Sequence, residues 1–278
     1  MKEKLIAVLA LLFVVSSVFA EESTTATGSQ DELGMDQKLA RAYDLYRKGD
    51  TVSLRQSEIQ MGVGVAYTTS NKNTFGIQQS SRALATQVFA SRGFGTGIEV
   101  SVSMPYITQS QRVETADATL ESNTISGFGD PTIRMMKMFQ TKDVGTTGIL
   151  SVTLPQGGNE LSRKETHTSL GASWSKVLRP AFVTGGLTWE RDWKSSVNGL
   201  GYNAGLGFFL NHALAVGGEI SGVVALNPKA GAVRDITSLG LKVAYQTAPD
   251  FGAVVMTSFG VGTDSPQSTI GVTTYWRF

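Results

Sequence analysis

The sequence contains no cysteine, only two histidines, and no marked imbalance of charge, with 24 basic and 23 acidic residues. The lack of cysteine excludes a disulfide framework, thiolate metal sites and cysteine nucleophiles. Because the charges nearly cancel, no basic surface is expected, and nucleic acid is not an expected partner. Stability and function must therefore come from packing and from other side chains.

Long apolar runs are absent beyond residue 20. The stretch MKEKLIAVLALLFVVSSVFA has a charged start at Lys2 and Lys4, an apolar centre, and a small residue at Ala20, which is typical of a secretory signal. Its apolar run is shorter than the roughly 20 residues that span a bilayer. We expect residues 1–20 to be a cleaved signal peptide, which leaves no transmembrane helix.

From about residue 56 the apolar residues alternate with small or polar ones, as in half-buried strands. Near the end of the chain, Ile270, Val272 and Trp276 share one face, and Gly271 and Thr273 share the other. Twelve such segments can be counted: 56–68, 82–92, 97–108, 129–140, 146–156, 168–178, 181–192, 200–210, 213–225, 235–247, 251–262 and 267–278. An even number suits a closed antiparallel bacterial barrel.

The connections between these segments alternate in length. Tight turns follow every second segment, at 95–97, 142–146, 179–180, 211–212 and 248–250, whereas the other connections are polar loops, the largest at about 109–128. Outer-membrane barrels have short periplasmic turns and longer external loops. The sequence therefore predicts an all-β fold: a twelve-stranded antiparallel transmembrane outer-membrane β-barrel over residues 51–278, preceded by a short N-terminal periplasmic helix.

Aromatic residues support this topology, because they should gather at the two membrane interfaces. One row falls near the external loops and the other near the periplasmic turns: Tyr67, Tyr106, Trp189 and Tyr202 in the first, and Phe139, Phe208, Tyr245, Trp276 and Phe278 in the second. Lys137 departs from the pattern, since it shares the lipid face with Met135. We expect it to reach toward the periplasmic interface.

The helix is predicted over about 36–48, within an N-terminal periplasmic segment 21–50. Asp36 can cap it and Gly49 can end it. A helix this short is unstable alone in water, so it should dock in the lumen, at the periplasmic rim or on a second copy of the chain, unless it is a frayed linker. The candidate plug or gate residues are Met35, Leu39, Tyr43 and Tyr46.

Charged residues on the inward face are the candidate pore lining: Glu58, Glu99, Arg134, Glu219, Lys242 and Arg277. Glu219 and Lys242 lie at similar depth on neighbouring strands, so a cross-strand ion pair is plausible. Mixed signs do not favour a strongly ion-selective pore. They favour a small neutral or weakly polar permeant or a closed resting state, although the charges could simply balance one another.

The chain ends in an aromatic run, TTYWRF. A terminal Phe278 with apolar residues at alternate positions before it resembles the carboxy-terminal signal read by the barrel-assembly machinery, which makes Tyr275, Trp276 and Phe278 candidate assembly residues. The alternative is that these residues only anchor the closing strand.

Three stretches, GIEVSVSMPY (97–106), GFGDPTIRMMKMF (127–139) and TGILSVTLPQGG (147–158), resemble strand motifs of the outer-membrane family named for the meta-pathway of phenol degradation. That family neighbours the secretion channels for functional amyloid. The resemblance implies a channel in the outer membrane of a Gram-negative bacterium, passing small organic, aromatic or hydrophobic compounds.

Three functions follow as hypotheses: this channel, a helix-gated secretion channel for an unfolded or amyloid-forming polypeptide, and a structural or adhesive barrel. An enzyme is not expected, because no nucleophile and base signature surrounds His167. His212 and His167 fall on opposite sides of the membrane, so no shared metal site and no cofactor are expected. The expected partners are outer-membrane lipid, the assembly machinery and the permeant or polypeptide, with a homo-oligomer as an open possibility.

Overall fold

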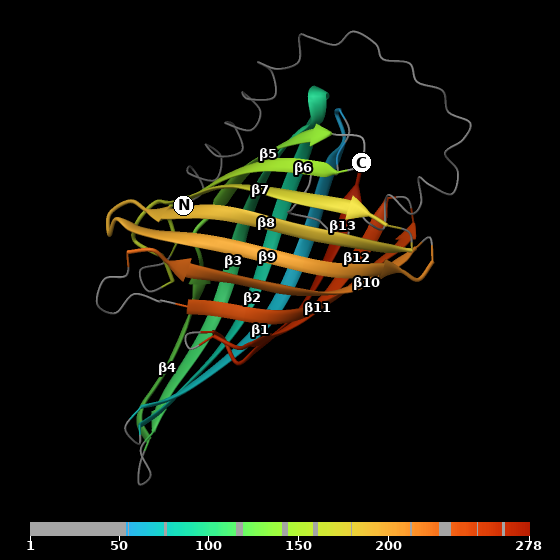
Figure 1. Ribbon diagram of the computed structural model, residues 1–278. Coiled ribbons are helices and arrows are strands. Elements are labelled where there is room, and N and C mark those ends of the chain that lie inside the picture. The colour runs from blue at the N-terminus through green and yellow to red at the C-terminus, as the bar shows by residue number, and fades with distance from the viewer. Residues whose placement is uncertain are drawn as a thin grey trace, which may run out of the picture.

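The computed structural model describes residues 54 and 56–278, apart from 75–76, 115–118, 141–143, 158–160, 179, 212, 228–234, 249 and 263–264. Thirteen strand segments form one antiparallel sheet (Figure 1). They are β1 (Ile59–Thr74), β2 (Ile77–Phe94), β3 (Ile98–Glu114), β4 (Thr119–Phe128), β5 (Thr132–Gln140), β6 (Gly145–Thr153), β7 (His167–Val177), β8 (Ala181–Asp192), β9 (Val197–Phe209), β10 (Leu214–Ala225), β11 (Asp235–Ala248), β12 (Phe251–Gly260) and β13 (Ser268–Arg277), with a 3-10 turn, η1 (Gly95–Gly97).

The sheet closes on itself, because β1 pairs with β2 on one side and with β13 on the other, where Gln60 lies opposite Arg277. Segments β4 and β5 both pair with β3, at successive stretches, and are separated only by residues 129–131. They form one interrupted strand, so the thirteen segments make twelve barrel strands. The predicted twelve-stranded antiparallel barrel is confirmed, whereas the helix predicted over 36–48 and the signal peptide 1–20 lie outside the described residues. No helix among the described residues has the length and apolarity to cross a bilayer.

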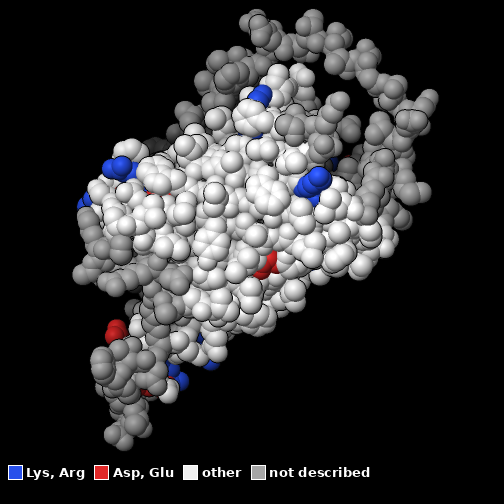
Figure 2. Space-filling model, viewed as in Figure 1, with Lys and Arg blue, Asp and Glu red and all other residues white. Residues whose placement is uncertain are grey.

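The outer face of the barrel is apolar and exposed. On β1, Met61, Val63, Val65 and Tyr67 are 38 to 51% exposed, whereas Gly62 and its alternate neighbours are buried. Figure 2 shows few charged side chains over the middle of the wall. An apolar surface of this extent is not stable against water, and a closed barrel leaves no backbone edge for lipid to cover. The barrel is therefore placed in the outer membrane, as predicted.

Lys137 keeps its place on the apolar face, opposite Ile98 and Gly148. Its ammonium group donates a hydrogen bond of 2.5 Å to the carbonyl of Thr96 in the η1 turn. The side chain thus reaches the periplasmic end of the barrel, where the charge remains near water.

The large external loop predicted at 109–128 is wrong. Residues 98–114 continue as β3 and residues 119–128 return as β4, and together with β1 and β2 they project beyond the other strands (Figure 1, lower left). Side-chain hydrogen bonds cross this ladder, from Ser110 to Thr124 at 2.8 Å and from Ser126 to Thr108 at 3.1 Å. Because both faces of the projection are polar, its strands lack the alternation that marks the rest of the barrel.

An apolar cluster lies on the inner face near the short turns. Phe182, Ala215, Ala244, Val254 and Tyr275 are buried there, with Phe89 and Phe209 packed against them. The rings of Phe182 and Phe209 are 5.0 Å apart between centroids, and those of Phe89 and Tyr275 are 5.2 Å apart. The barrel thus carries its core inside, toward the periplasmic end.

Candidate functional site: the lumen and its outer mouth

The inner cavity brings together three of the predicted pore-lining charges. Glu99, Arg134 and Lys242 line a space of about 380 Å³ inside the barrel. Its remaining wall contains hydroxyl groups and a mainly apolar set of larger side chains: Phe89, Met136, Val254, Met256 and Tyr275. The strand register explains the meeting, since Met136 lies opposite Glu99, and Arg134 lies opposite Ser101 on the same pair of strands.

The other three predicted pore-lining residues lie elsewhere. Glu219 is on the inner row of β10, opposite Gly205 and Gly240. Arg277 is opposite Gln60 at the closing seam, and Glu58 precedes β1, where its carbonyl accepts a hydrogen bond from the backbone N–H of Gly93. None of the three lines the inner cavity.

The strand register shows how Glu219 and Lys242, which are predicted to form an ion pair, lie relative to each other. Lys242 lies opposite Gly217, and Glu219 lies opposite Gly240, so the two residues are diagonal neighbours on β10 and β11. Long side chains can meet across such a diagonal. The ion pair stays a prediction.

Glu99 is fully buried, at 0% exposure. Its Oε2 accepts a hydrogen bond of 3.2 Å from the backbone N–H of Leu54, which is itself 4% exposed. A buried carboxylate requires such donors, so the chain ahead of β1 is tied to the inner wall at Leu54. No pattern in the sequence predicts this contact, because Leu54 belongs to no alternating segment. The candidate gate residues Met35, Leu39, Tyr43 and Tyr46 lie outside the described residues.

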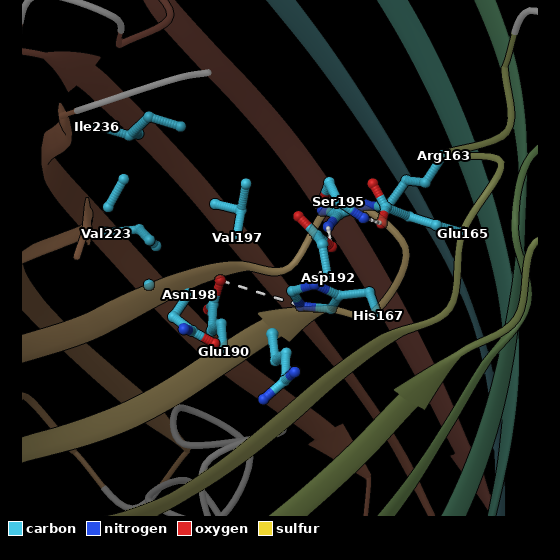
Figure 3. Close-up of a pocket in the computed structure, with 13 residues that line it drawn as sticks. Arg163, Glu165, His167, Glu190, Asp192, Ser195, Val197, Asn198, Val223 and Ile236 are labelled. Carbon is cyan, nitrogen blue, oxygen red and sulfur yellow. Dashed lines mark hydrogen bonds and ion pairs between the residues drawn. The ribbon is translucent and has the colours of Figure 1, made fainter. Parts of the chain in front are cut away.

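A second cavity, of about 520 Å³, lies at the outer ends of β7 to β11 (Figure 3). His167 stands at its centre. Its Nδ1 is 2.8 Å from Oδ1 of Asp192, and its Nε2 is 3.9 Å from Oε2 of Glu190. Arg163 reaches the same Asp192 oxygen at 3.5 Å. The sequence predicts His167 in an external loop, whereas the residue begins β7, and its side chain is only 13% exposed.

Asp130 organises the loop that forms this mouth. It is buried at the break between β4 and β5, and its two oxygens accept hydrogen bonds from the backbone N–H groups of Gly157, at 2.8 Å, and Arg163, at 2.7 Å. The connection between β6 and β7 is thereby folded back onto the barrel. The sequence contained a signal for this role in the GFGDP motif, but the partners of the carboxylate are 27 and 33 residues away.

Glu165 fastens the same loop to the connection between β8 and β9. Its Oε2 accepts a hydrogen bond of 2.7 Å from the backbone N–H of Ser195. Partial desolvation acts to raise the pKa of Glu165, but hydrogen bonds from Ser195 and from the Lys194 backbone, together with the Lys194 charge, outweigh it and leave the pKa below 4.5. The carboxylate is therefore held in its charged form.

The mouth is lined by charged and hydrogen-bonding side chains. Both ring nitrogens of His167 face carboxylates, with Asp192 at Nδ1 and Glu190 at Nε2. Among the described residues, no group of three or more His, Asp or Glu side chains could hold a metal ion.

The candidate assembly residues lie on both faces of β13. Tyr275 points inward and is buried, whereas Trp276 and Phe278 are exposed on the lipid side. Phe278 exchanges two backbone hydrogen bonds with Ile59, at 2.8 and 3.1 Å, and so closes the barrel. That the assembly machinery recognises these three residues stays a prediction.

Comparison with known proteins gives the class of fold. The sequence matches no protein-family model and no curated protein. Among solved structures, the COG4313 outer membrane channel from Pseudomonas putida F1 is similar, with a TM-score of 0.63, 12% identity, and coverage of 83% of this chain and 98% of that one.

Two further structures are similar at lower scores. The translocator domain of the autotransporter NalP from Neisseria meningitidis has a TM-score of 0.53, 12% identity, and coverage of 87% of this chain and 95% of its own. The KdgM porin has a TM-score of 0.51, 8% identity, and coverage of 79% and 99%. At such identities the likeness concerns the fold. The protein has the fold of the outer-membrane channel and porin barrels of Gram-negative bacteria.

Proposed function

We propose that this barrel is a channel through which small organic compounds, aromatic or hydrophobic in character, cross the outer membrane. The observation that carries the proposal is the inner cavity, where Phe89, Tyr275 and Met256 stand beside Glu99, Arg134 and Lys242. Rings and a thioether offer contacts to an apolar permeant, while charges of both signs give no strong preference for one sign of ion.

The motifs GIEVSVSMPY, GFGDPTIRMMKMF and TGILSVTLPQGG support the proposal through their resemblance to the phenol meta-pathway family. The fold shared with the Pseudomonas putida channel supports it at the level of architecture. Membership of the family and the aromatic character of the permeant are both part of the proposal.

The N-terminal segment 21–50 is proposed to act as the gate, after removal of the signal peptide 1–20. Leu54 supports this, because its backbone is bonded to Glu99 in the wall of the inner cavity. Movement of the chain just before Leu54 would act directly on a residue that lines the route.

Single-channel recording in planar bilayers tests the proposal, with the mature chain compared with a version lacking residues 21–50. Both versions are first checked for barrel formation by their heat-modifiable migration on gels. The channel proposal expects the deletion to give more frequent or longer openings, and liposomes with either version to pass benzyl alcohol faster than empty liposomes. No current and no faster passage from either version would overturn it and favour an adhesive or structural barrel. Current blocked by an unfolded polypeptide, without passage of benzyl alcohol, would favour a secretion channel.

A further inference from the structure

The cavity at the outer mouth has a polar wall and an apolar wall that face each other. The polar wall carries His167, Glu190 and Asp192, and the apolar wall carries Val197, Val223 and Ile236 (Figure 3). A volume of about 520 Å³ is within the range of pockets that take small organic ligands. The arrangement suits a molecule with one polar end and a hydrocarbon body.

The polar wall presents hydrogen-bond acceptors. The carboxylate of Asp192 can only accept, so a neutral His167 must donate from Nδ1 to Asp192, and its Nε2 then carries a lone pair. That lone pair faces Oε2 of Glu190 at 3.9 Å. Both atoms are then acceptors, and at this distance no hydrogen bond joins them directly.

The charges of the lining favour a cation. Glu165, Glu190 and Asp192 line the cavity with Arg163, whereas Arg191 belongs to the outward row, so the lining carries an excess of negative charge. Asp192 is matched by Arg163 and Glu165 by the Ser195 backbone. Among the described residues, the only ionisable partner of the Glu190 carboxylate is the His167 ring. Arg191 does not serve Glu190, since it belongs to the outward row of β8 and lies over the ring of Trp193, 4.8 Å from its centroid.

From these features we infer that the outer mouth is a binding site for small primary amines with an aromatic or aliphatic body. An ammonium group has N–H donors and one positive charge, which match the acceptors on Glu190 and His167 and the negative charge of the lining. The hydrocarbon body lies against Val197, Val223 and Ile236. The site requires only a folded barrel and holds whether or not the barrel conducts.

Calorimetric titration of the full mature protein in a non-ionic detergent at pH 7 tests the site. The probes are 2-phenylethylamine, 2-phenylethanol and phenylacetate, which share a body and differ in the polar end. We expect the amine to bind at least tenfold more tightly than the alcohol, and phenylacetate not to bind. Equal affinity for the three probes, or tighter binding of phenylacetate, would overturn the inference.

The variant Glu190→Gln addresses the acceptors. It keeps the size of the side chain and should weaken binding of the amine at least tenfold. Glu121→Gln, on the exposed projection, is the matched control and should change nothing. An unchanged affinity in Glu190→Gln, in a variant that still migrates as a folded barrel, would contradict the site. Conductance recorded on the same samples separates failure of this inference from failure of the channel proposal.

Discussion

The ring of Phe182 lies directly against the backbone of Gly207, its register partner on the neighbouring strand. A Cβ atom built on Gly207 would stand 2.2 Å from Cζ of Phe182. The same relationship joins Phe89 to Gly62 inside the barrel and Trp174 to Gly185 outside it, each pair being directly opposite in register. Glycine is therefore required at these positions so that a ring can lie flat on the wall.

Gly207→Ala is expected to destabilise the barrel by about 1–3 kcal/mol, the usual range for overpacking. The matched control is Gly218→Ala, whose Cβ would have no neighbour nearer than 3.6 Å. The measurement is urea unfolding in lipid vesicles, followed by tryptophan fluorescence. In a Phe182→Ala background the Gly207→Ala change should cost little, and an undiminished cost there would show that the ring is not the cause.

Asp130→Ala should release the connection between β6 and β7, because the N–H groups of Gly157 and Arg163 would lose their common acceptor. Each unpaired buried N–H costs about 1–3 kcal/mol. Limited trypsin digestion of intact cells reports the release, since cleavage after Arg163 and Lys164 should become at least several-fold faster. Asp250→Ala, at an exposed turn, serves as the control, and equal cleavage in both variants would argue against the anchor.

The contact of Glu165 with Ser195 should weaken in acid. The pKa of Glu165 is lowered in the folded protein, so its charged form stabilises the docked loop above the ordinary value of 4.5, and this stabilisation is lost as the pH falls below 4.5 through the lowered pKa. Hydrogen exchange at the Ser195 amide, corrected for the intrinsic pH dependence, should show protection that falls over this range. In Glu165→Gln the protection should be low and independent of pH, and a wild-type pH profile in that variant would exclude Glu165 as the titrating group.

Glu99→Gln is expected to increase the open probability of the channel, because Leu54 would lose a hydrogen bond to a charged acceptor. Such bonds contribute about 1.5–3 kcal/mol, which corresponds to roughly tenfold or more in an equilibrium. Single-channel recording measures the change. Glu121→Gln controls for a change of charge far from the lumen. Equal open probability in the wild type and in Glu99→Gln would show that the hydrogen bond between Leu54 and Glu99 does not affect gating.

Much of the barrel could be predicted from the sequence because lipid on one side and small or polar residues on the other impose a period of two. The faces of β13 follow this rule, with Ile270 and Trp276 outward and Gly271 and Tyr275 inward. The rule fails where both faces meet water, and the sequence therefore predicts a loop where β4 lies. Polar ladders such as Ser110 with Thr124 leave no periodic trace.

The mouth could not be predicted because its contacts join distant parts of the chain. Asp130 meets Arg163, and His167 meets Asp192, only after the strands have closed into a barrel. The inward direction of Glu99, Arg134 and Lys242 can be predicted from alternation alone. Their meeting in one cavity depends on the strand register, which alternation does not determine.

The projection of β1 to β4 gives the cell surface an uneven profile. From Tyr106 to Glu114, β3 continues beyond its pairing with β5, which at about 3.4 Å per residue is roughly 30 Å of strand. An antibody or a phage tail approaching the bacterium would touch this ridge, with its Ser, Gln and Arg side chains, before it reached the opening. Variation tolerated on the ridge could then alter recognition by such agents while the passage beneath it stays the same.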